Sequence, residues 1–186
     1  PMSSTTRSPL KWSRRCCLCP RRTPFSRSGG RTRSTFRFAA GGWRTLTYLE
    51  LLQSARRIAS ALIARGLSAE RPLVILSGNS IDHALIAFGA LYAGIPFCPV
   101  SPAYSLVSRD FAKLRGVMAL LTPGLVFAEN ATPFAAAIEA TVDPSVELAA
   151  SDGGVEGRRI TALAELLSGR EHADLDARHD AIGPDT

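Results

Sequence analysis

Apolar residues between positions 48 and 65 recur with the spacing of an α-helix. The residues on one face are Leu51, Ala55, Ile58 and Leu62. Arg56 and Arg57 fall on the opposite face, where we expect them to meet water. Thr47 and Glu50 form the pattern of a capping box, in which each side chain accepts a hydrogen bond from a backbone N–H at the helix start. The pattern predicts a helix over residues 48–65.

Two short apolar runs flank a second predicted helix. The run RPLVILSGN, residues 71–79, is continuous and of strand length, as expected for a parallel strand that is covered on both faces. Asn79 or Ser80 can cap the helix that follows, which we expect to end at Gly94. The apolar face of this helix is expected to hold Ile81, Ala84, Leu85, Phe88 and Tyr92. The run PFCPV, residues 96–100, predicts a second strand.

The alternation of helices and strands continues along the chain. The pattern predicts a helix over residues 108–120, a turn at 122–124, a strand over 125–129 and a helix that starts at Thr132 and Pro133. Residues 146–150 and 161–167 predict one more strand and one more helix. Parallel neighbours need a connection of helix length. The fold class that we predict is therefore α/β, with alternating helices and mostly parallel strands in a doubly wound sheet.

Three prolines, at positions 96, 99 and 102, shape the second predicted strand and the loop that leaves it. Proline lacks the backbone N–H, so a strand that contains Pro96 and Pro99 cannot be hydrogen-bonded fully on both sides. We expect this strand to be short or to lie at an edge of the sheet. Ligands of such sheets bind at the carboxyl ends of the strands, where this loop is located. From spacing alone, a stiff connection is favoured over a binding role.

The net charge of +6 comes entirely from the first part of the sequence. Residues 1–44 hold 11 of the 22 basic residues and none of the 16 acidic ones, which leaves the remainder with a net charge of −5. The predicted domain at 43–186 is therefore acidic, and nucleic acid is not favoured as its partner. The uncharged stretch 84–100 is interrupted by glycines and prolines and is shorter than the ~20 residues that cross a bilayer, so we assign it to the core and expect no membrane partner.

Residues 1–42 form a basic tail without helical or strand periodicity, which we predict to be disordered or frameshifted. A mitochondrial transit segment, a nucleic-acid-binding arm and a zinc site at Cys16, Cys17 and Cys19 are open alternatives. The cysteines lack a second ligand pair nearby, and four cysteines in the whole chain are typical of a reducing, cytoplasmic location. We hypothesise that the tail is GC-rich DNA translated out of frame. If neither other frame continues into GGWRTLTY, this hypothesis is wrong.

The order of these motifs resembles that of a known enzyme superfamily. TYLELLQSARRIASALIARGL, residues 47–67, and PLVILSGNSIDHALIAFGALYAGIPFCPVSPAYS, residues 72–105, resemble the amino-terminal region of adenylate-forming (AMP-binding) acyl-CoA synthetases. The fuller string at 77–114 is most similar to the feruloyl-CoA synthase group. The resemblance covers residues 43–186, and IGPDT at 182–186 is similar to the lead-in to the phosphate loop of that family. We therefore expect part of the amino-terminal lobe of the AMP-binding fold, truncated before the phosphate loop.

The resemblance implies an ATP-dependent acid–CoA ligase that activates an aromatic carboxylic acid, the small-molecule partner, through an acyl-adenylate. Enzymes of this kind use ATP, magnesium and coenzyme A. The Gly-rich pieces of this chain lack the lysine of a phosphate loop, so we expect no cofactor to bind these residues well and the chain alone to be inactive. The competing interpretation is a non-enzymatic α/β interaction module with a basic nucleic-acid-binding arm, which predicts salt-sensitive binding that is lost when residues 1–42 are deleted.

The sequence offers no catalytic, cofactor-binding or metal-binding residue that we can assign. Tyr104 and Ser105, in the loop after the prolines, are candidates for lining the substrate side of the site. His83 lies near a helix start beside Asp82, where the helix dipole favours a negative charge, and we interpret it as a surface or supporting residue. Cys98 is interpreted as a small buried hydrophobic residue and not as a nucleophile.

Overall fold

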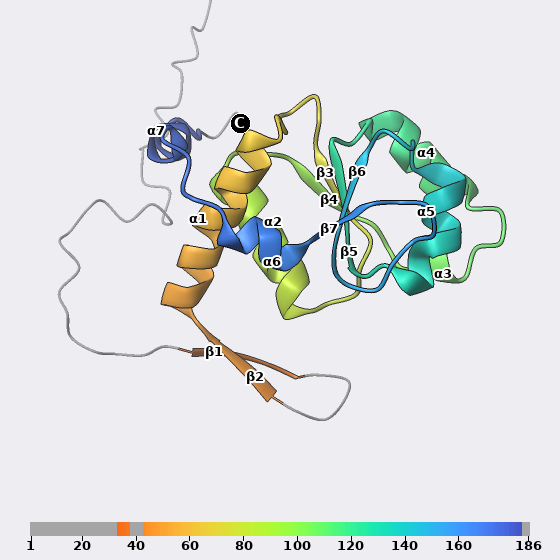
Figure 1. The fold of residues 1–186 in the computed structure, drawn as a ribbon, viewed down its shortest axis with the longest axis horizontal. Helices are drawn as coiled ribbons and strands as arrows, with labels where there is room; N and C mark the ends of the chain where they lie inside the picture. Colours follow the sequence, from red (N-terminus) through yellow and green to blue (C-terminus); the bar gives the residue numbers. More distant parts are fainter. Residues whose placement is uncertain (1–32, 38–42, 184–186) are drawn as a thin grey trace, which may run out of the picture. The chain divides into compact units, whose positions relative to one another are not determined.

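The computed structural model describes residues 33–37 and 43–183 (Figure 1). Its main sheet has five parallel strands in the order β4-β3-β5-β6-β7. The strands are β3 (Leu73–Ile75), β4 (Phe97–Pro99), β5 (Leu125–Asn130), β6 (Glu147–Asp152) and β7 (Ile160–Ala162). The α/β fold class with parallel strands is therefore confirmed.

Helices cover both faces of this sheet. They are α1 (Tyr48–Ala64), α2 (Ile81–Tyr92), α3 (Ala103–Leu106), α4 (Ala112–Leu121), α5 (Ala135–Thr141), α6 (Leu163–Ser168) and α7 (Leu175–Asp180), with a 3-10 turn η1 (Thr132–Phe134) before α5. Alternate residues of β3 point to opposite faces, as strand geometry requires. Leu73 and Ile75 pack with α1, α2 and α6, whereas Val74 packs with α4 and α5. Each face of the sheet therefore has its own apolar core.

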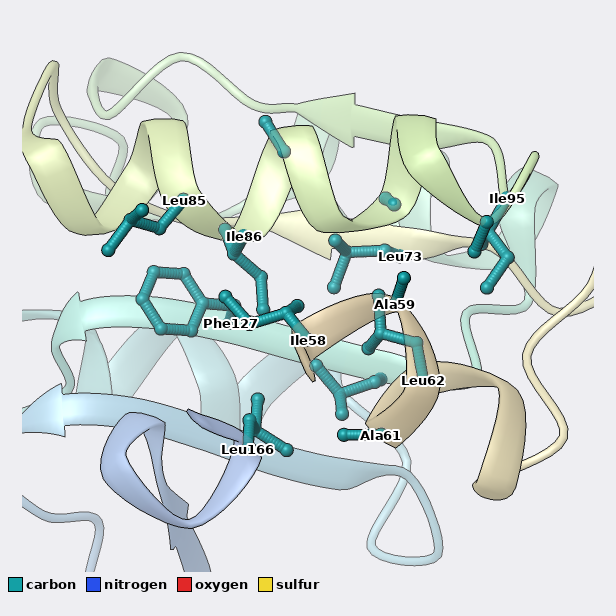
Figure 2. Packing of buried hydrophobic residues seen from close by; sticks show 14 of the residues in the cluster. Ile58, Ala59, Ala61, Leu62, Leu73, Leu85, Ile86, Ile95, Phe127 and Leu166 are labelled. Atoms are coloured by element: carbon teal, nitrogen blue, oxygen red, sulfur yellow. The ribbon is translucent and has the colours of Figure 1, made fainter. Parts of the chain in front are cut away.

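The predicted start of α1 is confirmed in detail. The Glu50 N–H donates to Thr47 Oγ1 at 3.2 Å, and the Thr47 N–H donates to Glu50 Oε2 at 2.7 Å. These two bonds make up the capping box. Further along the helix, Ile58 and Leu62 are fully buried against the sheet and α2 (Figure 2). The amphipathic pattern thus identified the buried face of this helix correctly.

Two expectations about which side chains face water were wrong. Phe88 of α2 is 47% exposed, whereas the small residues that follow it, Gly89 and Ala90, are buried, Gly89 against α1. The two helices approach so closely there that a Cβ atom on Gly89 would lie 2.7 Å from the Cβ atom of Ile58. Arg56 is also not on an open surface, since its side chain is 22% exposed and ion-paired to residues of the C-terminal part.

The prediction for the proline-containing strand is confirmed. β4 has three residues, lies at the edge of the sheet and pairs on one side with β3. The Leu73 N–H donates to the Pro96 carbonyl oxygen, and the Val100 N–H donates to the Ile75 carbonyl oxygen. Pro99 lies within the strand, and its missing N–H interrupts no ladder, because within residues 33–37 and 43–183 no further strand pairs with the outer side of β4.

The helix predicted over residues 108–120 begins later, at Ala112, and a separate short helix, α3, precedes it. A polar turn separates the two: Ser108 Oγ accepts from the Phe111 N–H, and the Asp110 carboxylate accepts from the Ala112 N–H. The bond from the Ala112 N–H, followed by one from Ser108, lowers the pKa of Asp110 below its usual value. Phe111 itself has a positive φ of 52°, which interrupts the helix.

Three strands were missed in the sequence pattern. The helix predicted over 161–167 begins later than expected, at Leu163, where α6 starts. The first two residues of the predicted helix belong to β7 instead. β1 (Arg33–Arg37) pairs antiparallel with β2 (Trp43–Thr47) to form a hairpin that leads into α1. β1 falls within the range 1–42 assigned to the tail. Residues 1–32 and 38–42, with Cys16, Cys17 and Cys19, lie outside the described residues, and for them the disordered or frameshifted tail stays a prediction.

No helix within residues 33–37 and 43–183 is long and apolar enough to cross a bilayer. Within the same residues, no group of three or more His, Cys, Asp or Glu side chains is placed to hold a metal ion.

Candidate functional site

The carboxyl ends of the parallel strands meet along one edge of the sheet, which we call the carboxyl edge. Polar side chains gather at this edge: Ser77 follows β3, Tyr104 lies in α3 after β4, and Asn130 and Asp152 are the last residues of β5 and β6. These strands are neighbours in the sheet, so side chains far apart in the sequence come to one side of the molecule. In open α/β sheets ligands bind at this side. The carboxyl edge is therefore the candidate site.

His83, at the start of α2, is turned back toward the end of β3. Its Nδ1 lies 3.0 Å from both Ser77 Oγ and the Gly78 carbonyl oxygen. In one tautomer of His83 the Nδ1 atom donates to the Gly78 carbonyl oxygen, and in the other it accepts from the Ser77 hydroxyl group. The interpretation of His83 as a surface or supporting residue stays a prediction.

Ser105 stands out among the polar side chains of the carboxyl edge. It lies in α3, is 6% exposed, and its Oγ has no hydrogen-bond partner within the part of the chain that the structure describes. Buried hydroxyl groups are usually hydrogen-bonded, because leaving one unpaired costs about 1–3 kcal/mol. The neighbouring Tyr104 ring lies 5.2 Å from the Lys113 ammonium group, which is a cation–π distance. The structure places both predicted residues after the carboxyl end of β4, and their role as substrate-side residues stays a prediction.

A compact polar turn joins the ends of β5 and β6, and sequence reasoning missed it. Asn130 Oδ1 accepts from the Thr132 N–H at 3.0 Å, and Thr132 Oγ1 accepts from the Gly154 N–H at 3.2 Å. Gly153 has a φ of +76°, and a Cβ atom there would lie 2.6 Å from Thr132 Oγ1. The signal that could have identified this turn is the Asp-Gly-Gly sequence at 152–154.

Cys98 lies in β4 as a free cysteine and is half-buried against the core that contains α4 and α5. It is therefore less enclosed than the buried hydrophobic residue that we expected. Its position on an edge strand explains the difference, because no strand covers its outer side in the described sheet.

Two hollows in the described part of the chain lie at the opposite edge, among the loops that enter the strands. They have volumes of about 460 and 480 Å³ and share Ser145 and Val146. Two of their arginines are engaged in structural contacts: Arg158 donates to the backbone carbonyl groups of Val142, Asp143 and Val146, and Arg65 pairs with Glu147 and Glu165. These hollows lie away from the carboxyl edge, where ligands of open α/β sheets bind.

Comparison with known proteins decides the family. Residues 25–179 match the family model described as AMP-binding enzyme. This chain belongs to the AMP-binding, adenylate-forming enzyme family. One relative, a plipastatin synthase of Bacillus subtilis (strain 168), is 37% identical over 94 residues. That match covers 50% of this chain and 4% of the relative.

Solved structures of the family share the fold. The benzoate CoA ligase from Burkholderia xenovorans LB400 superposes with a TM-score of 0.62 at 22% identity, over 84% of this chain and 29% of the ligase. ATP-bound MatB from Rhodopseudomonas palustris superposes with a TM-score of 0.51 at 24% identity, over 72% of this chain and 24% of MatB. This chain therefore spans less than a third of either structure. The ATP-bound MatB structure also shows that a relative with this fold binds ATP.

Proposed function

We propose that this chain is the amino-terminal part of a ligase that uses ATP to activate a carboxylic acid as an acyl-adenylate. The observation that carries the proposal is the family match over residues 25–179. It is supported by the parallel sheet, which the chain shares with a benzoate CoA ligase and with ATP-bound MatB. In this reaction the carboxylate attacks the α-phosphorus of ATP and pyrophosphate leaves, so the enzyme must neutralise charge on the phosphates.

The carboxyl edge does not by itself fit a magnesium–ATP complex. The side chains identified there are the neutral hydroxyl and amide groups of Ser77, Asn130 and Thr132 and one carboxylate, Asp152, and the described residues hold no cluster of metal ligands. A triphosphate and its metal need cationic and carboxylate groups. We therefore assign no step of the reaction to these residues and expect the chain alone to be inactive.

The acid that we propose is aromatic, of the feruloyl type, and the acceptor is coenzyme A. The string at 77–114 supports this proposal through its resemblance to feruloyl-CoA synthases. The structural similarity to a protein named as a benzoate CoA ligase also supports it. Tyr104 and Ser105 are the proposed substrate-side residues of this part of the enzyme, because α3 follows the carboxyl end of β4.

A second candidate is an amino-acid-activating unit of a peptide synthetase. The match to the plipastatin synthase favours it, as does the match, at 36% identity over 80 residues, to Phosphinothricin tripeptide synthetase PhsC of Streptomyces viridochromogenes. Both candidates form an acyl-adenylate. They differ in the acid that is activated and in the thiol that receives the acyl group.

The test uses the protein translated from the same gene through the codons that follow Thr186. We expect AMP release that requires ATP, ferulate or a related hydroxycinnamate, and coenzyme A, with none from the 186-residue chain. Release with an amino acid in the absence of coenzyme A would favour the peptide synthetase. No release with any carboxylic acid, or a stop codon directly after Thr186, would contradict the main proposal. Salt-sensitive nucleic-acid binding that is lost on deletion of residues 1–42 would support the interaction module instead.

A further inference from the structure

The segment from Gly169 to Gly183, which includes α7, lies against α1 and α2 (Figure 1). We call this segment the strap. The strap is joined to the helices by contacts between residues more than 85 positions apart in the sequence. One apolar side chain of the strap, Leu175, is buried, at 1% exposure, in the core that α1 and α2 share. The other contacts that attach the strap are hydrogen bonds, ion pairs and one stacked pair of rings.

Most of these polar contacts converge on Arg56 of α1. Its Nε and Nη2 atoms donate to the two carboxylate oxygens of Glu171, at 3.0 and 2.7 Å. Its Nη1 donates to Asp176 Oδ1 at 2.7 Å and to the Tyr92 hydroxyl of α2. A bidentate arginine–carboxylate pair has a defined geometry and is stronger than a bond between neutral groups. One guanidinium group therefore ties two points of the strap to both helices.

A second attachment lies at the far end of α7. The His179 ring stacks on the Tyr92 ring, with centroids 4.0 Å apart and planes within 5° of parallel. His179 Nδ1 also lies 3.2 Å from the Tyr92 carbonyl oxygen. His179 forms one wall of an apolar groove of about 280 Å³, whose other walls include Leu52 of α1 and Phe88 of α2. The strap thus closes one end of the groove between the two helices.

The backbone of the strap forms fewer hydrogen bonds to the helices than its side chains do. The bonds from the Leu175 N–H to the His172 carbonyl and from the Ile182 N–H to the His179 carbonyl both stay within the strap. The His172 N–H reaches outside, to Ser60 Oγ at 2.9 Å. The ion pairs are also open to water, since the side chains of Glu171 and Asp176 are 47% and 60% exposed. The strap can therefore detach without breaking any pairing of the five-stranded sheet.

We propose that the strap is a conformational device that opens as a unit from α1 and α2. Arg56, which we call the latch, holds it closed through its bonds to Glu171 and Asp176. Opening moves His179 away from Tyr92 and so uncovers one end of the apolar groove between α1 and α2. It also moves residues 181–183, which follow α7, away from the two helices. The opened state keeps the sheet and the core on the α4–α5 face intact, and it withdraws one side chain, Leu175, from the core on the α1–α2 face. Segments that are held by few apolar contacts and exposed polar bonds open with the smallest free energies in a protein.

Amide hydrogen exchange of the full 186-residue chain tests this proposal. Replacing the latch, Arg56→Gln, is expected to speed exchange of the amides at 175–182 by about tenfold, because both carboxylates lose their partner. Amides of β3 and β5 are expected to keep the exchange rates of the unchanged protein. The neighbouring substitution Arg57→Gln removes the same charge without the hydrogen bonds to Glu171 and Asp176. Since Arg57 attracts Glu171 only through space, this variant should change strap exchange much less than Arg56→Gln.

A second pair of variants keeps the test valid if Arg56→Gln fails to fold. Glu171→Gln alters the exposed end of the same ion pair and is expected to speed exchange in the strap. Glu165→Gln is its matched control. Glu165 is a similarly exposed carboxylate, at 53%, and it pairs with Arg65 at the end of α1, outside the strap. The proposal is wrong if Glu171→Gln leaves the strap amides unchanged. It is also wrong if the sheet amides accelerate as much as those of the strap, because Arg56 would then stabilise the whole domain.

Discussion

Replacing Gly89 by alanine tests the close crossing of α1 and α2. An alanine in the interior of a helix normally makes the folded state more stable than a glycine does, by about 1 kcal/mol, because glycine loses more backbone entropy on folding. At Gly89, however, the added Cβ atom would lie 2.7 Å from the Cβ atom of Ile58 and closer still to Ile58 Cγ2. Real Cβ atoms essentially never come within 3.0 Å of such neighbours.

The steric cost is expected to exceed the gain in helix propensity. Ile58 is fully buried and packed against the sheet, so its side chain cannot turn away (Figure 2). Overpacking of a filled core costs about 1–3 kcal/mol, and a close contact between two helix backbones belongs at the upper end of that range. After the gain of about 1 kcal/mol for alanine, Gly89→Ala should lower the free energy of unfolding by about 2 kcal/mol.

Urea unfolding followed by circular dichroism measures this difference. Gly116→Ala is the matched control, because Gly116 lies in the interior of α4 and a Cβ atom there would meet nothing within 4 Å. It should raise the free energy of unfolding by about 1 kcal/mol. An Ile58→Ala background removes the nearer clashing atom, Cγ2, but keeps the Cβ atom, so Gly89→Ala should destabilise the protein less there than in the unchanged chain. Equal stabilisation by Gly89→Ala and Gly116→Ala would refute the close crossing.

Three further predictions follow from single contacts. Thr47→Ala removes the capping box and should lower the free energy of unfolding by about 1 kcal/mol in the same urea assay. Ser105→Ala should leave stability unchanged or raise it by up to about 1 kcal/mol, since the Ser105 oxygen has no partner in the described residues; a marked loss in thermal unfolding would show that the hydroxyl group is bonded. Arg56 holds the pKa of Glu171 below its usual value of 4.5, so this carboxylate stabilises the strap at higher pH and the stabilisation is lost as the pH falls through the lowered pKa. Protection factors of amides 175–182 should therefore decrease below about pH 4.5, and Glu171→Gln should remove that decrease.

The elements that were predicted well are those whose signals are local. The capping box at Thr47 and Glu50 marks the start of α1 because both partners lie within one helical turn. The prolines of β4 predicted a short edge strand because proline removes a hydrogen-bond donor wherever it occurs. Such signals do not depend on the rest of the fold.

The features that were missed depend on contacts between distant residues. Phe88 carries the same apolar signal as Leu85, and the closeness of Gly89 to Ile58 decides which of them is buried. Arg56 looks like a surface residue in sequence, because its partner Glu171 lies 115 positions away. In the candidate site, the position of Ser105 after β4 could be predicted from the sequence. Its burial without a hydrogen-bond partner could not, because that depends on the packing of α3 against other elements.

The central claim is that these residues build one part of an adenylate-forming enzyme. Carboxylate-dependent exchange of labelled pyrophosphate into ATP measures formation of the acyl-adenylate directly, without the thiol step. The account predicts exchange with ferulate in the protein translated through the codons after Thr186, and none in the chain of 186 residues. Absence of exchange in that longer protein with every aromatic acid and amino acid supplied would contradict it.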